Sequence, residues 1–345
     1  MRIATALLDR ATEHADRGSV RVGRVVGDPA DAVHLLDSPV TVLDLLRDGT
    51  LLDAGRDALS VRPVALDSVR LLAPLQPPTV RDFVSFEEHV EGMRNLTGVP
   101  EAWYAAPAFY FSNPYATLGP SDDVPMPPGS AVLDFELEVA AVIGRTGRDL
   151  TPEQGTSAIA GFTILNDWSA RDLQFAEMQV GLGPAKGKDT ATTLGPWLVT
   201  ADEFTSDSEG FLDLALTASV DGTVVGSDLL SNMGWPFGDL VAYASRGTEV
   251  RPGDVLGSGT CGHGGCLGEL WGRGVSRDEL PPLGPDSVVT LEVEGIGTLT
   301  SHVVAGAEPT AIPPARRRPR ARPRASNASL LALDARKATL SGATP

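Results

Sequence analysis

Several segments of the chain alternate apolar and polar residues, which is the pattern of a β-strand with one buried face. Residues 134–139 alternate strictly between acidic and apolar residues, and a short apolar run follows at 161–165. Residues 212–218 alternate in the same way and continue past Asp221-Gly222, a dipeptide typical of β-hairpin turns. The pattern therefore predicts that the second half of the chain consists mostly of strands and turns.

Helical patterns are fewer and shorter. Residues 41–47, 87–96 and 170–178 have the spacing and composition of short helices. Thr151 followed by Pro152 is a typical helix start, with Thr as the N-cap and Pro at the first helical position. We therefore expect isolated helices between the strands.

Prolines at 74, 77 and 78 follow a strand-like segment and mark a boundary. We expect a small N-terminal domain at 1–76, a larger catalytic domain at 77–308 and a basic, Pro/Arg-rich disordered tail at 309–345. The chain contains 37 Gly and 27 Pro but only 6% aromatic residues, which indicates many turns. The predicted fold class is α+β and β-rich.

The composition also indicates the cellular compartment of the protein. The apolar fraction of 42% is enough for a sizeable core, and the chain has no apolar run long enough for a transmembrane helix. The first ten residues lack the apolar centre of a signal peptide. Cys261 and Cys266 are the only cysteines, so we expect no disulfide framework and a cytoplasmic protein.

The net charge of −17 is unevenly distributed. Residues 312–345 contain seven Arg, one Lys and one Asp, a local charge of +7, which leaves −24 for the rest of the chain. A body with that charge repels phosphate backbones, so we expect no nucleic-acid binding through the folded part, and no membrane binding. The tail has no apolar periodicity and is typical of a disordered extension.

The acidic strand is the first candidate for chemistry. Asp134, Glu136 and Glu138 would share one strand face, and adjacent residues on a face are only about 7 Å apart. Their carboxylates repel one another unless a cation lies between them, and Mg²⁺ and Ca²⁺ prefer oxygen ligands. Asp167, after the apolar run, is a candidate third acid. The alternative is an ordinary solvated strand face.

Further motifs resolve this choice. Together with the acids, they resemble the fumarylacetoacetate hydrolase family over residues 80–306, and the order of the motifs is specific. The motifs are Arg81-Asp82-Phe83, Glu136-x-Glu138, Asn166-Asp167-Trp168-Ser169-Ala170-Arg171-Asp172, Gly187-Lys188 and Gly257-Ser258-Gly259-Thr260.

The resemblance implies a mixed β-roll catalytic domain beside a small N-terminal domain, often in a homodimer. It implies a metal site for Mg²⁺ or Ca²⁺, with Mn²⁺ as a further candidate. The implied ligands are Asp82, Glu136, Glu138 and Asp167. Asp134 lies outside the family pattern and is expected to be a surface acid or one that supports the ligands.

The resemblance also implies hydrolysis of a C–C bond in a 1,3-diketo acid, an acylpyruvate or a fumarylacetoacetate-like substrate, with a metal-stabilised enolate leaving group. His89, seven residues after Asp82, matches the histidine that activates water. Glu269, in a Glu-Leu pair, matches the glutamate that orients this histidine. Lys188 matches the lysine that stabilises the developing oxyanion.

Arg171 and Gln174, three residues apart on one helix face, are expected to contact substrate oxygens, with Thr260. Tyr110 and Tyr115 are candidates to replace a substrate-binding tyrosine that the family has where this chain has Met178. Simpler interpretations exist: His89 and Lys188 as ordinary structural or surface residues, and Arg171 as the partner of Asp172 or another nearby acid.

Other functions stay open. Relatives with similar ligands decarboxylate, isomerise or hydrate 2-oxo acids through the same kind of enolate. A catalytically idle binding protein that works through its basic tail is a second alternative. Residues 261–266 contain two Cys and one His, but these are too close together for the usual zinc motifs, and we interpret them as a Gly-rich loop beside the active site.

Overall fold

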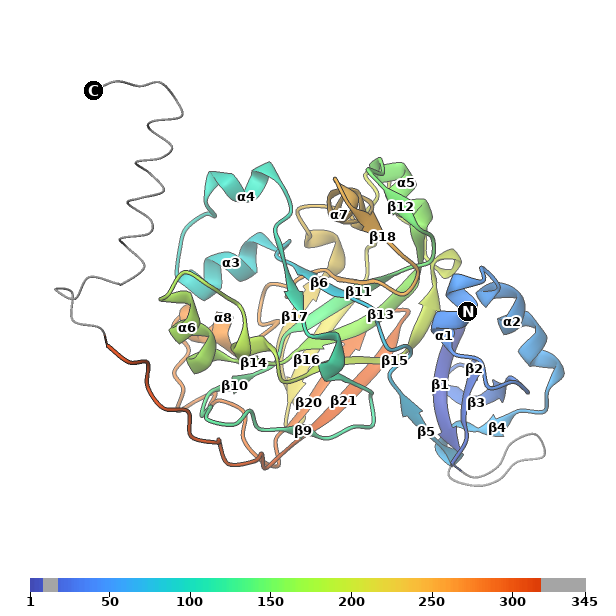
Figure 1. Ribbon diagram of the computed structural model, residues 1–345, viewed down its shortest axis with the longest axis horizontal. Coiled ribbons are helices and arrows are strands. Elements are labelled where there is room, and N and C mark those ends of the chain that lie inside the picture. Colours follow the sequence, from blue (N-terminus) through green and yellow to red (C-terminus); the bar gives the residue numbers. More distant parts are fainter. Residues whose placement is uncertain (9–17, 318–345) are drawn as a thin grey trace, which may run out of the picture. The chain divides into compact units, whose positions relative to one another are not determined.

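The computed structural model describes residues 1–8 and 18–317 (Figure 1). Residues Met1–Ala307 form one compact unit and Glu308–Pro345 a second, and each is described by itself. The second unit is irregular up to residue 317, and the predicted disorder of the tail falls largely outside the described residues.

A twelve-stranded sheet forms the centre of the first unit. Its main path runs β4-β3-β2-β1-β15-β13-β11-β19-β6-β7, with β5 paired to β1 and β8 paired to β15. The strands are β1 Arg2–Leu8, β2 Val20–Gly27, β3 Ala30–Leu35, β4 Val64–Ala65, β5 Val69–Leu72, β6 Val80–Phe83, β7 Phe109–Ser112, β8 Thr117–Leu118, β11 Leu137–Ile143, β13 Ile159–Asp167, β15 Thr192–Thr200 and β19 Val255–Gly257.

A second sheet has five strands in the order β17-β16-β20-β21-β9, and two small two-stranded pairs complete the set. Asp221 and Gly222 form the predicted hairpin turn between β16 and β17, both with positive φ. The remaining strands are β9 Val124–Pro125, β10 Leu133–Asp134, β12 Gly147–Arg148, β14 Ser169–Ala170, β16 Ala215–Val220, β17 Thr223–Leu229, β18 Glu249–Val250, β20 Val288–Val293 and β21 Gly297–Val304.

Short helices connect these strands. The helix predicted at 87–96 ends at Arg94 because Asn95 adopts a left-handed conformation. Thr151 caps its helix as predicted, in a reciprocal arrangement with Gln154. The helices are α1 Val42–Arg47, α2 Leu51–Asp57, α3 Glu87–Arg94, α4 Glu101–Ala105, α5 Pro152–Ala158, α6 Arg171–Met178, α7 Phe237–Ser245 and α8 Leu267–Gly272.

The N-terminal segment contributes strands to the central sheet. β1 pairs with β15 in antiparallel register, with Arg2 opposite Val199 and Ile3 opposite Leu198. Strands β1 to β5 therefore extend the sheet that carries β11 and β13. A domain boundary at residue 76 remains a prediction.

The core lies on both faces of β11. Leu137, Val139 and Ala141 belong to one apolar cluster together with Leu216 and residues of the five-stranded sheet. Ala140 and Val142, on the other face, pack in a second cluster with apolar residues of α1. The strand is therefore buried on both sides, so its acids lie inside the protein and not on a solvated face.

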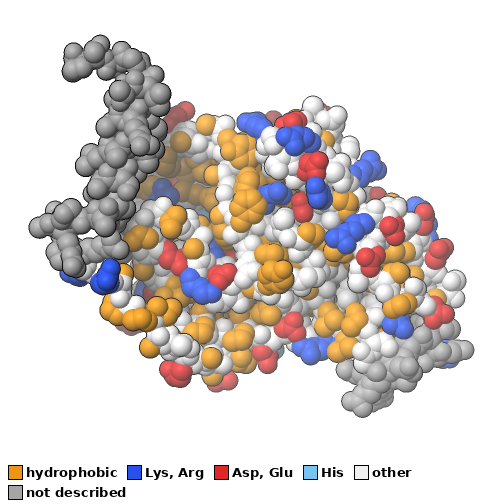
Figure 2. Space-filling view, viewed as in Figure 1, with side chains coloured by type: hydrophobic (Ala, Val, Ile, Leu, Met, Phe, Trp, Pro, Cys, Tyr) orange, Lys and Arg blue, Asp and Glu red, His pale blue; other side chains and the backbone are white. Residues whose placement is uncertain are grey.

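The outer surface is mixed. Figure 2 shows acidic and basic side chains interspersed on the viewed face, with apolar side chains between them. Among the described residues, no helix combines the length and the apolar character needed to span a membrane.

Candidate metal centre and active site

Strand pairing brings four acids together from distant parts of the sequence. Glu136 lies just before β11, and Asp167 is the last residue of β13. The backbone N–H of Asp167 donates to the Glu136 carbonyl at 3.3 Å. β19 pairs with both β6 and β11, which places Asp82 of β6 near Glu138 of β11. Gly257 of β19 makes this approach sterically feasible, because a Cβ there would lie 2.6 Å from both carboxylates.

The four carboxylates form a compact cluster. Asp82, Glu136, Glu138 and Asp167 each offer an oxygen atom, and these atoms lie within 4.8 Å of one another. All four residues are buried, with exposures of 0–3%. One oxygen each of Asp82, Glu138 and Asp167 is buried without a hydrogen-bond partner among the described residues. Buried unpaired carboxylates are costly, and a hard divalent cation is the ligand that such oxygens fit.

The protonation of this cluster reflects its burial. Burial raises the pKa of Asp82, and it raises that of Glu138 still further because Asp82 lies beside it. The pKa of Asp167 is raised to about 8, because burial and the charges of Glu136 and Asp82 outweigh Lys188. The protein alone therefore favours the protonated forms of Asp82, Glu138 and Asp167, and a cation would replace those protons.

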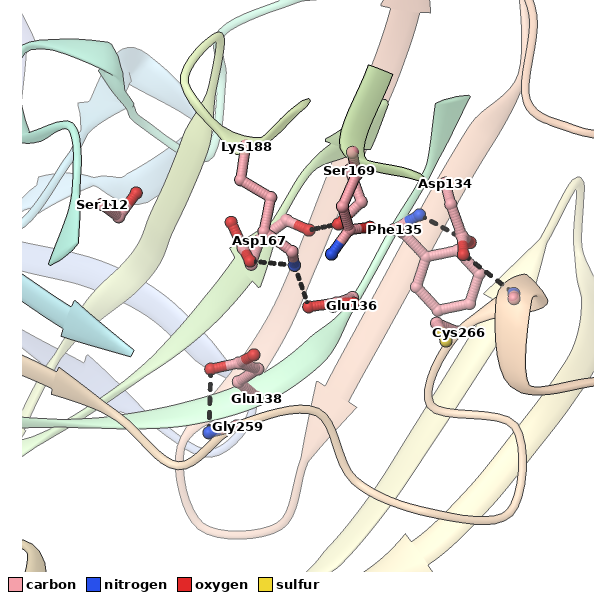
Figure 3. A network of polar contacts seen from close by, with 12 residues as sticks. Ser112, Asp134, Phe135, Glu136, Glu138, Asp167, Ser169, Lys188, Gly259 and Cys266 are labelled. Atoms are coloured by element: carbon pink, nitrogen blue, oxygen red, sulfur yellow. Dashed lines mark hydrogen bonds and ion pairs between the residues drawn. The ribbon is translucent and has the colours of Figure 1, made fainter. Parts of the chain in front are cut away.

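Two cations border the cluster. Lys188, in the 3₁₀ turn η4 Lys186–Lys188, points between Glu136 and Asp167 (Figure 3). Its Nζ donates to Glu136 Oε2 at 2.5 Å and to Asp167. Arg171 Nη1 lies 2.7 Å from the other oxygen of Glu136. Although burial opposes it, Lys188 and Arg171 hold the pKa of Glu136 well below its usual range.

Asp134 holds Arg171 in place. Arg171 donates to Asp134 Oδ2 from Nε at 2.9 Å and from Nη2 at 2.7 Å. Asp134 also accepts the backbone N–H groups of Leu267 and Gly268 at the start of α8. Of the two alternatives expected for Asp134, the surface acid is wrong, because the residue is fully buried; it instead holds Arg171, which contacts the predicted ligand Glu136.

Arg171 is thus paired with acids other than Asp172. The Asp172 carboxylate accepts from Ser130 and from the Ala131 backbone instead. Gln174 Oε1 accepts from Arg171 Nη1 at 3.2 Å, so these two predicted substrate contacts lie side by side. Their contact with a substrate stays a prediction.

His89 lies on α3 at the edge of the cluster. A ring nitrogen of His89, a carboxylate oxygen of Glu136 and the Sγ atom of Cys266 all lie within 4.8 Å of one another. Nδ1 is 3.9 Å from Cys266 Sγ. Burial lowers the pKa of His89 to about 4, although Glu136 opposes this, so the imidazole is neutral near pH 7. A neutral imidazole can accept a proton.

Glu269 has partners other than His89. Its carboxylate accepts from Arg273 Nε at 2.9 Å and from the Gly264 N–H at 3.2 Å. Arg273 lies one turn later on the same helix, at the spacing that favours such an ion pair, and it also donates to the Glu88 carbonyl. The expected hydrogen bond between His89 and Glu269 is not present among the described residues.

Cys266 is the residue near His89 that sequence reasoning missed. It caps the N-terminus of α8, where Sγ accepts the Glu269 N–H at 3.3 Å. The sequence signal was its position just before the Glu-Leu pair, within the loop already expected to border the active site. Burial raises the pKa of Cys266 well above its ordinary value, so the thiol is neutral.

The predicted tyrosines differ in position. Tyr110 of β7 donates to Asp167, and Lys188 Nζ lies 5.7 Å from its ring centre. Tyr115 is 94% exposed and does not line the cluster. Thr260 is buried just after Gly259, whose N–H donates to Glu138 at 3.2 Å.

A surface pocket is lined in part by Lys188. It has a volume of about 440 Å³ and reaches Lys188 from the surface. Its other lining residues are Phe111, Ser112, Asn113, Ala185, Lys186 and Asp189.

Comparisons with known proteins agree with this geometry. Residues 79–304 match the family model described as fumarylacetoacetate (FAA) hydrolase C-terminal. Protein Rv2993c of Mycobacterium tuberculosis is 33% identical over 257 residues, which cover 74% of this chain and 86% of that protein. The human mitochondrial oxaloacetate tautomerase FAHD2A is 30% identical over 271 residues, covering 77% of this chain and 80% of that protein.

Solved structures show the same fold. A fumarylacetoacetate hydrolase from Exiguobacterium antarcticum superposes with a TM-score of 0.68 at 27% identity, over 88% of this chain and 99% of that chain. A maleylpyruvate hydrolase from Sphingobium sp. SYK-6, determined with manganese(II) and pyruvate, superposes with a TM-score of 0.64 at 21% identity, over 89% of this chain and all of that one. The latter likeness concerns the fold alone. The chain belongs to the fumarylacetoacetate hydrolase family.

Proposed function

We propose that this protein is a divalent-metal-dependent hydrolase that cleaves a C–C bond in a 1,3-diketo acid, an acylpyruvate or a fumarylacetoacetate-like compound. The observation that carries the proposal is the cluster of four buried carboxylates, three with an unpartnered oxygen, beside Lys188 and a neutral His89. Burying four carboxyl groups together destabilises the fold, so a functional role explains the cluster better than a structural one.

Asp82, Glu136, Glu138 and Asp167 would hold the ion, Mg²⁺, Ca²⁺ or Mn²⁺. When bound, the cation supplies a Lewis acid that stabilises negative charge on the substrate's oxygens, including that of the enolate formed when the C–C bond breaks. A 1,3-diketo acid suits this site because its neighbouring oxygens can face one cation together.

His89 would act as general base. Its neutral ring would take a proton from water as the water oxygen adds to a substrate carbonyl carbon. Lys188, charged and buried between two acids, would donate a hydrogen bond to the oxyanion that forms. The C–C bond then breaks, the carbonyl fragment leaves as a carboxylic acid, and the enolate takes up a proton at carbon.

Substrate would enter through the pocket beside Lys188. Tyr110 and Lys188 both donate to Asp167, and they would orient the substrate's oxygens beside the acids. Arg171, Gln174 and Thr260 remain predicted contacts, and Arg171 would also keep Glu136 ionised.

The test is turnover of acetylpyruvate, fumarylpyruvate, fumarylacetoacetate and oxaloacetate with Mg²⁺, Ca²⁺ or Mn²⁺, each with and without EDTA. We expect loss of the diketone absorbance and release of two acids, both stopped by EDTA. Release of carbon dioxide from oxaloacetate, without turnover of the other three substrates, would show that the protein is a decarboxylase and not a hydrolase.

A second candidate is a tautomerase or isomerase of 2-oxo acids. It is favoured by Glu269, which is bonded to Arg273 and Gly264 and so does not orient His89 for attack by water. A curated relative at 30% identity is an oxaloacetate tautomerase. Metal-dependent keto–enol exchange of oxaloacetate by proton NMR, without cleavage of any diketone, would select this reaction.

Absence of turnover with every substrate would favour the catalytically idle alternative. In that case Mn²⁺ should still bind to the acidic cluster. A protein that neither binds Mn²⁺ nor turns over a substrate would contradict the proposal as a whole.

A further inference from the structure

A second pocket lies beside β6, the strand that carries Asp82. It has a volume of about 830 Å³ and is lined by the four arginines Arg47, Arg81, Arg148 and Arg251, together with Glu249 and Asp254. Arg81 and Asp82 are neighbours in β6, and successive strand residues point to opposite faces. The Arg81 side chain therefore leaves β6 on the face opposite to the Asp82 carboxylate, and Arg47 comes to the pocket from α1.

Arg81 is the unusual member of this pocket. It is only 6% exposed, yet its Nε is buried without a hydrogen-bond partner among the described residues. Its one ion pair with a described residue, from Nη1 to Asp254 Oδ2, is long at 3.4 Å. A guanidinium carries five N–H donors, and leaving such donors unsatisfied inside a protein is costly.

A second unsatisfied donor lies close by in the sequence. The hydroxyl of Thr79, which also lines the pocket, is buried without a partner in the described part of the chain. Arg81 stacks against Phe109 and Phe111, with its Cζ 6.0 and 5.5 Å from their ring centres. Nε itself is shielded from the pocket, so Arg81 contributes its positive charge to the lining and not a free donor.

The acids of the pocket are already engaged. Asp254 Oδ2 accepts the backbone N–H of Arg251 at 3.0 Å, in addition to Arg81. Glu249 Oε2 accepts two hydrogen bonds from the Arg251 guanidinium, at 3.0 and 2.7 Å. Arg148 lies 3.5 Å from Asp149, which is outside the pocket lining.

The pocket therefore has a surplus of positive charge in a chain whose net charge is −17. Arg47, Arg148 and Arg251 are exposed at its rim, and Arg81 is buried at its base. Guanidinium groups bind carboxylates and phosphates through paired, charge-assisted hydrogen bonds. The volume exceeds that of a single inorganic ion.

We propose that this pocket binds a small dianionic oxyacid, a phosphate-bearing or dicarboxylate metabolite. Its oxygens would accept from the exposed guanidinium groups of Arg47 and Arg251, and the buried charge of Arg81 would add to their attraction. The site is independent of the metal centre and of the reaction proposed for it.

The test is calorimetric titration of the full chain with orthophosphate and with succinate, in EDTA and at constant ionic strength. EDTA prevents binding through a metal at the acidic cluster. Arg47→Gln and Arg251→Gln remove exposed side chains and so preserve folding. Each should weaken binding about tenfold, the equivalent of about one charge-assisted hydrogen bond.

Arg277→Gln is the matched control, because it removes the same charge from an exposed arginine outside the pocket. It should leave the affinity unchanged. Arg81→Gln removes the positive charge beneath the pocket, so it should weaken binding as well; circular dichroism checks that this variant folds.

Binding of phosphate only, or of succinate only, would identify the ligand class. Equal affinities of the wild type, Arg47→Gln and Arg251→Gln would overturn the proposal and place the anion elsewhere, for example on the arginines of residues 312–345. No binding of either probe at about 10 mM would also overturn it, since physiological ligands bind more tightly than that.

Discussion

Glu138 has the most unfavourable environment of the proposed ligands. It is fully buried, one of its oxygens has no partner among the described residues, and Asp82 lies beside it. The sequence predicted both residues as ligands through the family motifs. Their depth of burial, which raises the pKa of both carboxyl groups, follows only from the apolar packing on both faces of β11.

Replacing Glu138 by Gln should weaken Mn²⁺ binding by at least about tenfold, because even residues outside the ligand set cost that much when removed. In EDTA the same variant should be about as stable as the wild type, because the raised pKa of Glu138 keeps its carboxyl group neutral without a metal, as the Gln amide is. Calorimetry and thermal unfolding measure the two effects. Glu292→Gln, on an exposed position of β20, is the control, and wild-type Mn²⁺ affinity in Glu138→Gln would remove Glu138 from the ligand set.

Replacing His89 by Ala should lower kcat by about 10²–10⁴-fold, the usual contribution of a general base, with metal binding nearly unchanged. His302→Ala removes an exposed histidine and serves as the control. Steady-state kinetics of the substrate found active would measure the effect. Undiminished turnover in His89→Ala would contradict the proposed mechanism.

The pH profile tests the same residue. The pKa of His89 is lowered to about 4, so the neutral base persists well below pH 6.5 and kcat/KM should fall only as the pH approaches 4. A loss of activity centred near 6.5 would show that the ring is more solvated than its burial indicates.

At the scale of elements, β19 determines whether the acids meet. Its Gly257 lies between β6 and β11, and both Asp82 and Glu138 fill the space that a side chain would occupy. The sequence contained this glycine in a family motif but gave no steric reason for it. The reason appears only when three strands from distant parts of the chain are paired.

Gly257→Ala should displace both carboxylates, because its Cβ would lie 2.6 Å from each, and metal affinity should fall by at least about tenfold. The displaced atoms are the ends of side chains, so the fold should survive. Gly284→Ala is the control, since a Cβ there meets no atom within 4 Å. Unchanged Mn²⁺ affinity in Gly257→Ala would mean that the carboxylates can shift at no cost.

Across the whole molecule, the buried acids link stability to pH. The pKa of Asp167 is about 8 in the folded protein and 3.8 as a free side chain, so the folded state binds more protons between these values. Its contribution to stability is complete below about pH 4 and is lost as the pH rises through 8. His89 acts in the opposite sense, but only between 6.5 and about 4.

The metal-free protein should therefore become less stable between pH 6.5 and 8, by up to about 1.4 kcal/mol per pH unit for each group that titrates. Urea unfolding in EDTA measures this, and Asp167→Asn should reduce the slope. A metal should bind more tightly as the pH rises, because it competes with protons. A flat stability profile in EDTA would indicate that the acids are ionised without a metal.

Deleting residues 312–345 should leave turnover unchanged, because every residue proposed for the site lies between 82 and 269. Kinetics of the truncated and full-length proteins make the comparison. A loss of turnover would assign the basic tail a part in function, as the idle binding alternative requires.

The sequence by itself determined the β-rich fold class, the family and the four acids of the cluster, because these depend on local alternation and on short ordered motifs. Capping at Thr151 and the turn at Asp221-Gly222 were also predictable, since both are set by neighbouring residues. The pairings between residues distant in the sequence were not predictable. Arg171 with Asp134, Glu269 with Arg273, and His89 beside Cys266 were decided by how the strands and helices pack, because each buried charge takes the partner that tertiary structure brings within reach.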